Sequence, residues 1–449
     1  MAWLYPTKRY LHFDHIISYN DYVKSYVENP NRIEKHSFLP FLKFEKEYSR
    51  FMGYDYVDSA TKKPVKEKKR PILYASHIDG FVYRFYSDKI NLKYNEWVSK
   101  RNFDECPTAY RNNKKGKSNI HYAVDVISYI VESEKCYIMV GDYEHFFDTL
   151  NHRYLKSKLK EVLGVESLPS DYYNILKSVM RYTYIEKDAV ENYLKQRGKI
   201  INLMNAYFTN MEQFRAFKKE THLLKRNLEK FGIPQGTALS ASLANVYMID
   251  VDEKINTIVK NFDGIYRRYS DDFIVVIPKS QENVDFNSIV SQIKNEIQKS
   301  NLKLQEEKTE LFEFDENNIY SLVNHRKARL DYLGFCFDGK NVYVRQKSVY
   351  KFYRNAYKCI KIARNKSVKK GSSVLLYRRK IYRLYTHLGK HDIRKNKSSE
   401  NTKKYYGNFL SYMERADNVF KRIDKINCCI LDQISHWKRK IFYKCNMRN

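Results

Sequence analysis

Strand-length apolar runs alternate with longer amphipathic stretches along most of the chain. The apolar runs at 72–75, 136–140 and 273–277 are each bounded by charged or turn-forming residues, as expected of buried strands. Apolar residues recur at helical spacing in three stretches, 81–98, 120–131 and 286–297. The two periodicities together predict an α+β fold.

The remaining segments carry weaker signals. We expect mostly helix in 1–60, a loop in the basic run 62–70, another loop in 112–119, several helices in 151–230 and one helix over 238–259. Residues 332–337 and 342–344 flank Asp338-Gly339, which predicts a β-hairpin. After Arg345 the pattern is predominantly helical.

The segment Tyr269-Ser270-Asp271-Asp272 joins the two β-rich runs of a predicted hairpin. Adjacent carboxylates backed by apolar strands repel each other, and a divalent cation relieves that repulsion. An ordinary polar turn is the alternative at this point, because Ser and Asp are common turn residues.

The charge is concentrated at the end of the chain. The 449 residues carry a formal net charge of +30, yet residues 345–449 alone hold 29 Lys and Arg against 6 Asp and Glu. Such a balance favours a polyanionic partner. The last quarter is therefore the predicted polyanion surface, with Tyr and Phe interleaved for stacking.

The seven cysteines form no CxxC pair, which is typical of a reducing compartment and gives no structural zinc site. No run of 18 apolar residues exists and residues 1–20 show no signal-peptide pattern. We expect a cytoplasmic protein with no membrane partner.

A third carboxylate ends the apolar run 136–140. Asp142, in the sequence Asp142-Tyr-Glu-His-Phe-Phe-Asp148, lies 129 residues before Asp271, but strand ends can converge in space. Three convergent carboxylates suit two Mg²⁺ ions about 3.5–4 Å apart, which activate an attacking hydroxyl and stabilise a leaving pyrophosphate.

The order of these motifs resembles that of bacterial reverse transcriptases. The matching motifs, in chain order, are Asp142…Phe146-Phe147-Asp148, Gly232-Ile-Pro-Gln-Gly236…Ser240…Leu243-Ala-Asn245, Tyr269-Ser-Asp-Asp272, Lys308-Thr309 and Tyr332-Leu-Gly-Phe335. Upstream, Arg70-Pro71-Ile72…Asp79 and Ala109-Tyr-Arg111…Ser118-Asn119 are similar to finger motifs of group II intron-like enzymes. The family most often has Ala where this chain has Ser270.

The finer resemblance is to the abortive-infection and defence-associated (unknown-group) reverse transcriptases. It rests on Val342-Tyr-Val-Arg345…Lys347-Ser348 and on Asn408-Phe409…Tyr412…Arg415-Ala416. This resemblance implies antiphage defence, with a non-coding RNA as template.

The family resemblance assigns roles residue by residue. It implies that Asp142, Asp271 and Asp272 are the catalytic metal ligands, and that Phe147 is a steric gate against ribonucleotides. Other nucleotide-binding positions are Tyr143, Gln235, Gly236, Lys308, Arg70 and Arg111. Primer or template contacts are expected at Tyr269, Ser270, Leu333 and Gly334. The basic charge of the last quarter, and not a family motif, adds Arg378, Arg379 and Lys380 as primer or template contacts. Core packing remains the alternative for Phe147, and a solvated turn for Lys308.

The implied architecture is a right hand, with fingers, a palm containing an antiparallel sheet, and a helical thumb. Residues 1–120 would form the N-terminal and fingers region, 121–345 the palm with a helical insertion at about 152–230, and 346–449 the basic thumb. The cofactor would be two Mg²⁺ ions, with Mn²⁺ as a substitute. The partners would be an RNA template, dNTPs and the DNA product, and a homo-oligomer is compatible with the sequence.

Two other classes of function stay open. One is a retroelement enzyme of the group II intron or retron type. The other is template-independent DNA synthesis, or a catalytically silent RNA-binding protein. The intact carboxylate set argues against the silent protein.

Overall fold

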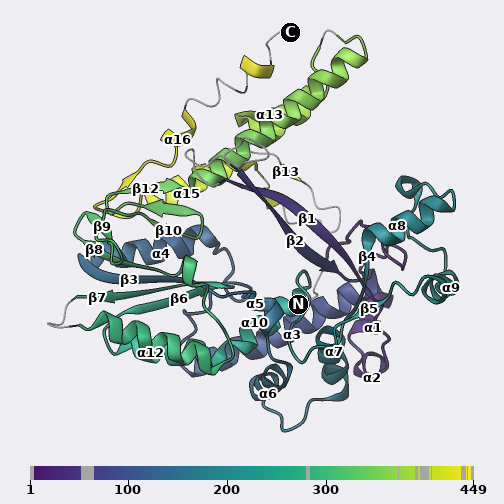
Figure 1. Ribbon diagram of the computed structural model, residues 1–449, viewed down its shortest axis with the longest axis horizontal. Coiled ribbons are helices and arrows are strands. Elements are labelled where there is room, and N and C mark those ends of the chain that lie inside the picture. The colour runs from purple at the N-terminus through teal and green to yellow at the C-terminus, as the bar shows by residue number, and fades with distance from the viewer. Residues whose placement is uncertain are drawn as a thin grey trace.

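The computed structural model describes residues 5–51, 65–279, 284–372, 374–389, 393–394, 404–405, 407–435, 441 and 443–445. Helices and strands are mixed throughout, as the α+β prediction requires (Figure 1). Within these residues, no helix is long and apolar enough to span a membrane.

A five-stranded antiparallel sheet lies between two hydrophobic cores. Its order is β6 (Ile265–Tyr269), β7 (Asp272–Pro278), β3 (Lys135–Asp142), β8 (Glu310–Asp315) and β9 (Asn318–Ser321). Alternate residues of β7 enter two different cores: Phe273, Val275 and Ile277 pack on one side, and Ile274 and Val276 on the other. Because both faces are covered, β7 is apolar from Phe273 to Ile277, as its sequence indicates.

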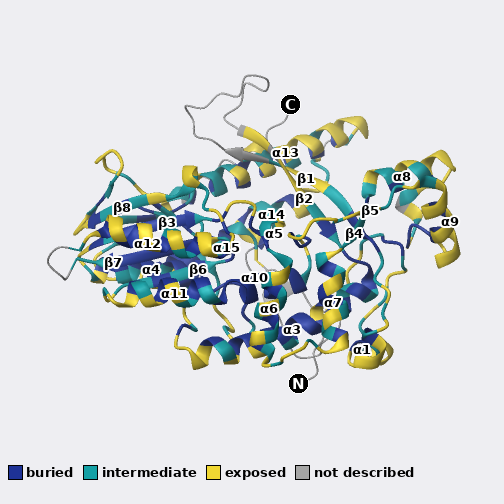
Figure 2. Ribbon diagram, turned by 60° about the horizontal axis from the view of Figure 1, so that its bottom comes forward, coloured by how far each residue is buried: buried dark blue, intermediate teal, exposed yellow. Residues whose placement is uncertain are grey.

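Helices α11 (Ile249–Lys260) and α12 (Phe286–Lys299) cover one face of this sheet, and α4 (Asn119–Glu132) covers the other (Figure 1). The buried residues of α12 are Phe286, Ile289, Val290, Ile293 and Ile297, which confirms the apolar face predicted for that stretch. Figure 2 shows the central strands β3 and β7 mostly buried, whereas α1, α9 and the far part of α13 carry exposed surface.

A second sheet lies next to α4 and leads into the C-terminal helices. It contains β10 (Leu330–Tyr332), β11 (Phe335–Phe337), β12 (Asn341–Val344) and β15 (Asn427–Cys428), so the hairpin predicted at 332–344 is confirmed. The helices that follow are α13 (Gln346–Lys369), α14 (Arg378–Tyr385), η3 (His387–Gly389), α15 (Phe409–Phe420) and α16 (Asp432–Ser435), with β13 (Ile393–Arg394) paired to β14 (Lys404–Tyr405).

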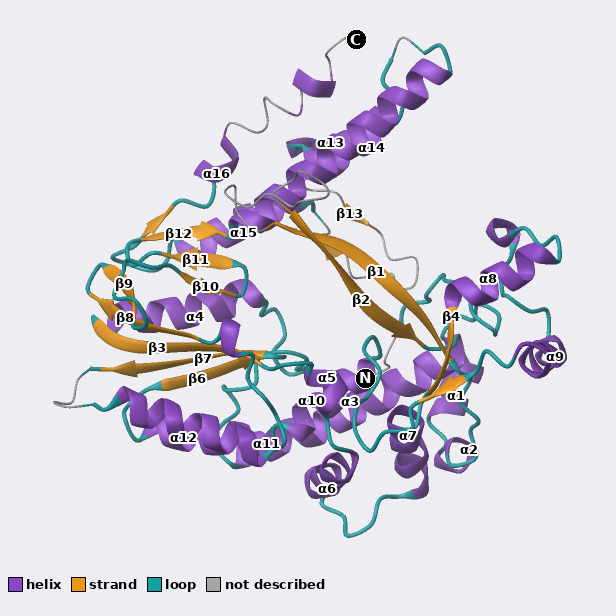
Figure 3. Ribbon diagram, in the orientation of Figure 1, coloured by secondary structure: helices purple, strands orange, loops and turns teal. Residues whose placement is uncertain are grey.

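A long two-stranded ribbon, β1 (Phe41–Phe51) with β2 (Val65–Tyr74), crosses the molecule and contacts α13 (Figure 3). Strands β4 (Thr183–Glu186) and β5 (Lys225–Arg226) complete its sheet. Around its base lie α1 (Asp21–Val27), α2 (Pro30–Ile33), α3 (His77–Lys100), α5 (Phe146–Thr149), α6 (His152–Leu163), α7 (Ser170–Met180), α8 (Lys187–Gln196), η1 (Ile201–Leu203), α9 (Met211–Thr221) and α10 (Ala238–Tyr247). The helices predicted in 151–230 are thus confirmed.

Three sequence predictions were wrong. Residues 5–51 are not mostly helical, because α1 and α2 are short and 41–51 is a strand; residues 52–60 lie outside the described part. The predicted loop 62–70 is a strand from Val65 onward, since its backbone pairs with β1, while 62–64 are not described. The single helix over 238–259 is interrupted at Met248, which separates α10 from α11.

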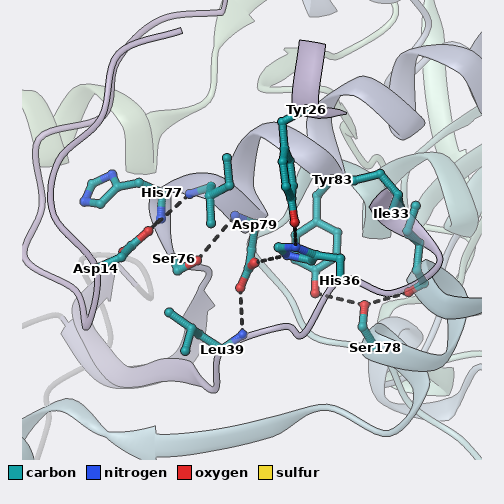
Figure 4. A network of polar contacts seen from close by, with 12 residues as sticks. Asp14, Tyr26, Ile33, His36, Leu39, Ser76, His77, Asp79, Tyr83 and Ser178 are labelled. Atoms are coloured by element: carbon teal, nitrogen blue, oxygen red, sulfur yellow. Dashed lines mark hydrogen bonds and ion pairs between the residues drawn. The ribbon is translucent and has the colours of Figure 1, made fainter. Parts of the chain in front are cut away.

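A buried polar network fixes the start of α3 (Figure 4). The Asp14 carboxylate accepts hydrogen bonds from the backbone N–H groups of His77 (2.7 Å) and Ile78 (3.2 Å). Asp79 accepts from His36 Nε2 at 2.7 Å and from the Leu39 N–H at 2.9 Å. These bonds tie the N-terminal segment to α3, and α3 in turn supplies one wall of the site described next.

Candidate active site

The adjacent carboxylates lie on the tight turn between β6 and β7. Ser270 adopts a left-handed conformation (φ +65°), which costs a non-glycine residue about 1 kcal/mol or more. Across the sheet, Asp142 at the end of β3 pairs in register with Asp272, and the Tyr143 N–H donates to the Asp271 carbonyl at 3.1 Å. The antiparallel register therefore brings three carboxylates to one edge of the sheet.

Burial and neighbouring charges perturb the two carboxyls of the turn. Burial, followed by the charge of Asp142, raises the pKa of Asp271, and the positive charge of Arg70 partly opposes this rise. Loss of hydration, then the charges of Asp271 and Asp142, raises the pKa of Asp272 to about 6, although this side chain still reaches solvent. Burial and like charge therefore both oppose ionisation of Asp271 and Asp272 at this edge.

Lys308 forms an ion pair with Asp142 through Nζ and Oδ2. The chain before Lys308 is fixed on the same strand end, because the Gln305 N–H donates to the Asp142 carbonyl at 2.8 Å. With Lys308 paired to Asp142, the side chains as they stand do not form a metal site: among the described residues, no three His, Cys, Asp or Glu are grouped so that they could hold a metal ion. The oxygen donors and their mutual repulsion nevertheless fit a hard divalent cation, which would replace the lysine at Asp142.

A cavity of about 590 Å³ lies among the ribbon, α3 and α10. Its volume is within the range of small-ligand sites. It brings together five of the predicted nucleotide-binding positions, Arg70, Arg111, Phe147, Gln235 and Gly236. These positions come from four separate regions of the chain, so the fold and not the sequence spacing unites them.

Gly236 is required at the joint between α10 and the ribbon. Its φ of +121° disfavours any residue with a side chain, and a Cβ would lie 2.5 Å from the Leu73 carbonyl oxygen. The Leu73 N–H donates to the Gln235 carbonyl at 3.0 Å, so the two segments are hydrogen-bonded at this point. The close backbone approach that Gly236 permits in this structure is to β2.

Two predicted nucleotide-binding residues have internal roles. The Tyr143 ring is buried in the core, 5.5 Å from the ring centre of Phe273, so its side chain does not line the cavity. Arg111 lies at the cavity wall, but its guanidinium is held by Asn95, by an ion pair with Asp104 and by the Pro107 carbonyl. Both side chains were assigned by position in a motif, which carries no information on side-chain direction.

The predicted primer and template positions occupy two further places. The Ser270 hydroxyl lies 3.0 Å from the Tyr110 hydroxyl, and Tyr269 is half-buried with its ring 6.3 Å from that of Tyr122. Leu333 and Gly334 form the β10–β11 turn, both with positive φ (+47° and +98°).

The Asn119 side chain links the β10–β11 turn to helix α15. The Asn119 side-chain amide donates to the Leu333 carbonyl and to the Tyr412 hydroxyl of α15, each at 3.0 Å. Helix α14 lies elsewhere and exposes the remaining three predicted residues, Arg378, Arg379 and Lys380.

Sequence reasoning missed the contribution of α3. Arg84, Asp88 and Asn91 line the cavity from this helix, and the carboxylate of Asp88 pairs with Arg84 Nε at 3.3 Å. The spacing 84, 88, 91 forms a polar stripe along one helical face. That stripe, in an otherwise apolar-patterned helix, is the sequence signal that could have identified this wall.

Comparisons with known proteins identify the family to which this chain belongs. The family model described as "Reverse transcriptase (RNA-dependent DNA polymerase)" matches residues 83–337, and no curated protein sequence matches. Among solved structures, telomerase from Candida albicans in complex with a fragment of telomeric RNA is similar at 14% identity and a TM-score of 0.41, covering 72% of this chain and 48% of that one.

Two structures of apo telomerase from Candida tropicalis are also similar. The form truncated from the C-terminal domain has 13% identity and a TM-score of 0.39, and the match covers 61% of this chain and 52% of that one. The other has 15% identity and a TM-score of 0.36, and the match covers 61% of this chain and 45% of that one. This chain thus spans about half the length of the telomerase chains it matches. Because the family match extends over more than half of the chain and includes all three carboxylates, the chain belongs to the reverse transcriptase (RNA-dependent DNA polymerase) family.

Proposed function

We propose that this protein synthesises DNA on an RNA template, joining a primer hydroxyl to the α-phosphate of a dNTP. The observation that carries the proposal is the three-carboxylate edge, Asp142, Asp271 and Asp272. Its turn contacts the wall of the cavity, because the Ser270 hydroxyl lies 3.0 Å from that of Tyr110, which lines the cavity. Charge repulsion at that edge supports a cation site, and the cavity volume suits a nucleotide.

Asp142, Asp271 and Asp272 would hold two Mg²⁺ ions, or Mn²⁺ in their place. These ions, when bound, lower the pKa of the attacking hydroxyl and neutralise the leaving pyrophosphate. Lys308, released from Asp142, would then be a cation free to meet the pyrophosphate. Its present ion pair keeps it within reach of the reacting groups.

The cavity residues would orient the dNTP. Arg70 extends a positive charge toward Asp271, as its effect on the pKa of that carboxyl indicates, and would contact the triphosphate. Phe147 lines the cavity and follows the metal-bearing strand, which is the place for a ring that would crowd a 2′-hydroxyl. Arg111, bound to internal partners, would support the cavity wall.

The β1–β2 ribbon has two chemically different faces. Register pairs share a face, and Lys46 pairs with Arg70, whereas Glu47 pairs with Lys69. Lys69 is compensated by Glu45 (3.3 Å) and Glu47 (3.4 Å).

No ion pair of Lys46, Lys66 or Arg70 exists within the described part of the chain. This basic face is continuous with the cavity through Arg70, which favours a nucleic-acid backbone along it.

We further propose the right-hand division into fingers (1–120), palm (121–345) and thumb (346–449). The thumb would follow an RNA or RNA–DNA duplex through its basic surface, including Arg378, Arg379 and Lys380. Parts of 346–449 lie outside the described residues, 395–403 among them.

The finer function we propose is antiphage defence in the cytoplasm, with a dedicated non-coding RNA as template. The motif at Asn408–Ala416 supports it. Asn408 caps α15 by accepting from the Leu410 N–H at 3.0 Å, and Tyr412 contacts Asn119 beside the β10–β11 turn. This motif therefore joins the predicted thumb to the predicted primer-binding turn.

Primer extension with products read by sequencing tests the proposal. The purified protein is given an annealed RNA template of defined sequence, a DNA template, or a primer alone, with each dNTP in turn. Complementary DNA made on RNA supports the proposal, whereas untemplated tails would favour template-independent synthesis. No incorporation under any condition would leave only RNA binding.

Sequencing the nucleic acid that co-purifies with the protein separates defence from mobility. One dedicated non-coding RNA supports the defence role, and intron or retron RNA favours a retroelement.

A further inference from the structure

A buried arginine lies directly behind the catalytic turn. Arg268 and Asp252 have side chains that are 1% and 0% exposed, and they pair through two bonds, Nε to Oδ1 at 2.8 Å and Nη2 to Oδ2 at 2.6 Å. Arg268 Nη1 donates to the Ser270 carbonyl at 3.1 Å, and both Nη atoms contact Asn245 Oδ1 at 3.2 Å. These five contacts match the five N–H donors of a guanidinium.

A buried ion pair is a poor device for stability alone. Taking two charges out of water costs several kcal/mol per ion, and apolar residues of similar volume often stabilise as well or better. The Arg268–Asp252 pair does more than fill the core, because Arg268 also holds the carbonyl of Ser270. Ser270 is the strained residue before Asp271. A left-handed serine persists only where its surroundings over-determine it.

The same residue also holds the loop that leads to the cavity. The Arg268 N–H donates to the Cys106 carbonyl at 2.7 Å, and its own carbonyl accepts from the N–H (2.9 Å) and the hydroxyl (2.8 Å) of Thr108. Asn245 adds a bond from its side-chain amide to the Ala109 carbonyl at 3.0 Å. Tyr110, which lines the cavity, follows at once. The carboxylate turn and the cavity wall thus share one buried anchor.

We propose that Arg268 and Asp252 are positioning residues, which set the orientation of Asp271 and Asp272 and their distance from the nucleotide cavity. The proposal rests on the proposed polymerase function for its catalytic consequence. The positioning of Asp271 and Asp272 themselves is tested separately, through Mn²⁺ binding in the absence of substrate.

The test compares Arg268→Lys, and Arg268→Met combined with Asp252→Leu, against the control Arg267→Gln. Arg267 is the neighbour on the same strand, and it pairs with Glu105 and Asp125, each at 3.0 Å and both exposed. Lysine keeps the charge but cannot make the five contacts. The apolar double variant removes both charges, so it retains packing without the directed bond to Ser270.

Three quantities are measured for each protein: the melting temperature, the Mn²⁺ dissociation constant by electron paramagnetic resonance, and kcat and KM for primer extension. We expect Arg268→Lys and the double variant to lower kcat by about 10²-fold, because a 1 Å misplacement of reacting groups costs that much. Mn²⁺ binding should weaken in both, the dNTP KM should change far less than kcat, and Arg267→Gln should behave as the parent.

Folded variants with parental kcat and Mn²⁺ affinity would overturn the proposal. If the double variant does not unfold cooperatively, Arg268→Lys decides alone. A parent protein that binds Mn²⁺ yet extends no primer would contradict the proposed function, while the Mn²⁺ comparison would still decide whether Arg268 positions the carboxylates.

Discussion

Gly236→Ala tests whether the joint between α10 and the β1–β2 ribbon sets the shape of the cavity that we propose binds the nucleotide. The added Cβ would lie 2.5 Å from the Leu73 carbonyl oxygen and 3.5 Å from Ile72 Cγ2. The obstructing atom is backbone, so relief requires β2 to move. That movement would lengthen the 3.0 Å bond between Leu73 and Gln235 and would carry Arg70 with it.

The expected cost has two parts. A φ of +121° with a side chain is strained by about 1–3 kcal/mol, and overpacking against a fixed neighbour adds about 1–3 kcal/mol. The unfolding free energy should therefore fall by about 2–6 kcal/mol. Because the displaced strand bears Arg70, the dNTP KM should rise, by about tenfold for each 1.4 kcal/mol of binding lost.

Gly198→Ala is the matched control. Gly198 also has positive φ (+73°), but nothing lies within 4 Å of its added Cβ, so it should lose only the left-handed penalty of about 1–2 kcal/mol and keep its KM. Urea denaturation gives the free energies, and single-nucleotide incorporation gives KM. The reasoning fails if Gly236→Ala loses no more stability than Gly198→Ala, or if a destabilised Gly236→Ala binds dNTPs as the parent does.

Further predictions concern Phe147, the basic C-terminal helices and Asp14. Phe147→Ala should raise rNTP incorporation relative to dNTP; an unchanged ratio in an active variant would show that the ring only packs. In filter binding, the logarithm of the duplex association constant should fall with the logarithm of salt concentration at a slope of about −4 or steeper. Reversing the charges of Arg378, Arg379 and Lys380 should make that slope shallower. An unchanged slope would contradict a thumb that contacts the phosphates of the duplex.

Burial raises the pKa of Asp14 to about 6, so the native state binds more protons than the unfolded chain between about pH 4 and 6, and stability falls as pH rises through that window. Asn at position 14 can still accept a hydrogen bond from the His77 N–H but carries no charge. Asp14→Asn should therefore melt at a higher temperature than the parent at pH 7 and at the same temperature as the parent at pH 4. An equal rise at both pH values would refute this.

The carboxylate edge could be predicted from sequence because its signals are local. A buried apolar run ending in Asp142 and another beginning after Asp272 define two strand ends, and strands of one sheet can bring such ends together. The hairpin around Ser270 followed from turn chemistry. The five cavity positions followed from family motifs, which carry positions but not side-chain directions, and Tyr143 and Arg111 show the difference.

The ribbon and the buried anchor could not be predicted in the same way. In residues 65–70 the side chains of Lys66, Glu67, Lys69 and Arg70 are charged and exposed, so no apolar alternation marks this strand. The strand is identified by its backbone pairing with β1. Arg268 and Asp252 are 16 residues apart in different elements. Their contact depends on α11 packing on the sheet, which is a tertiary event without a local pattern.

The central claim is that Asp142, Asp271 and Asp272 form the metal site for DNA synthesis. Incorporation of labelled dNTP on a primed RNA template, by the parent and by Asp271→Ala/Asp272→Ala at matched melting behaviour, tests it most directly. We predict incorporation by the parent in Mg²⁺ or Mn²⁺ and none by the folded double variant. Equal incorporation by both proteins would contradict the claim.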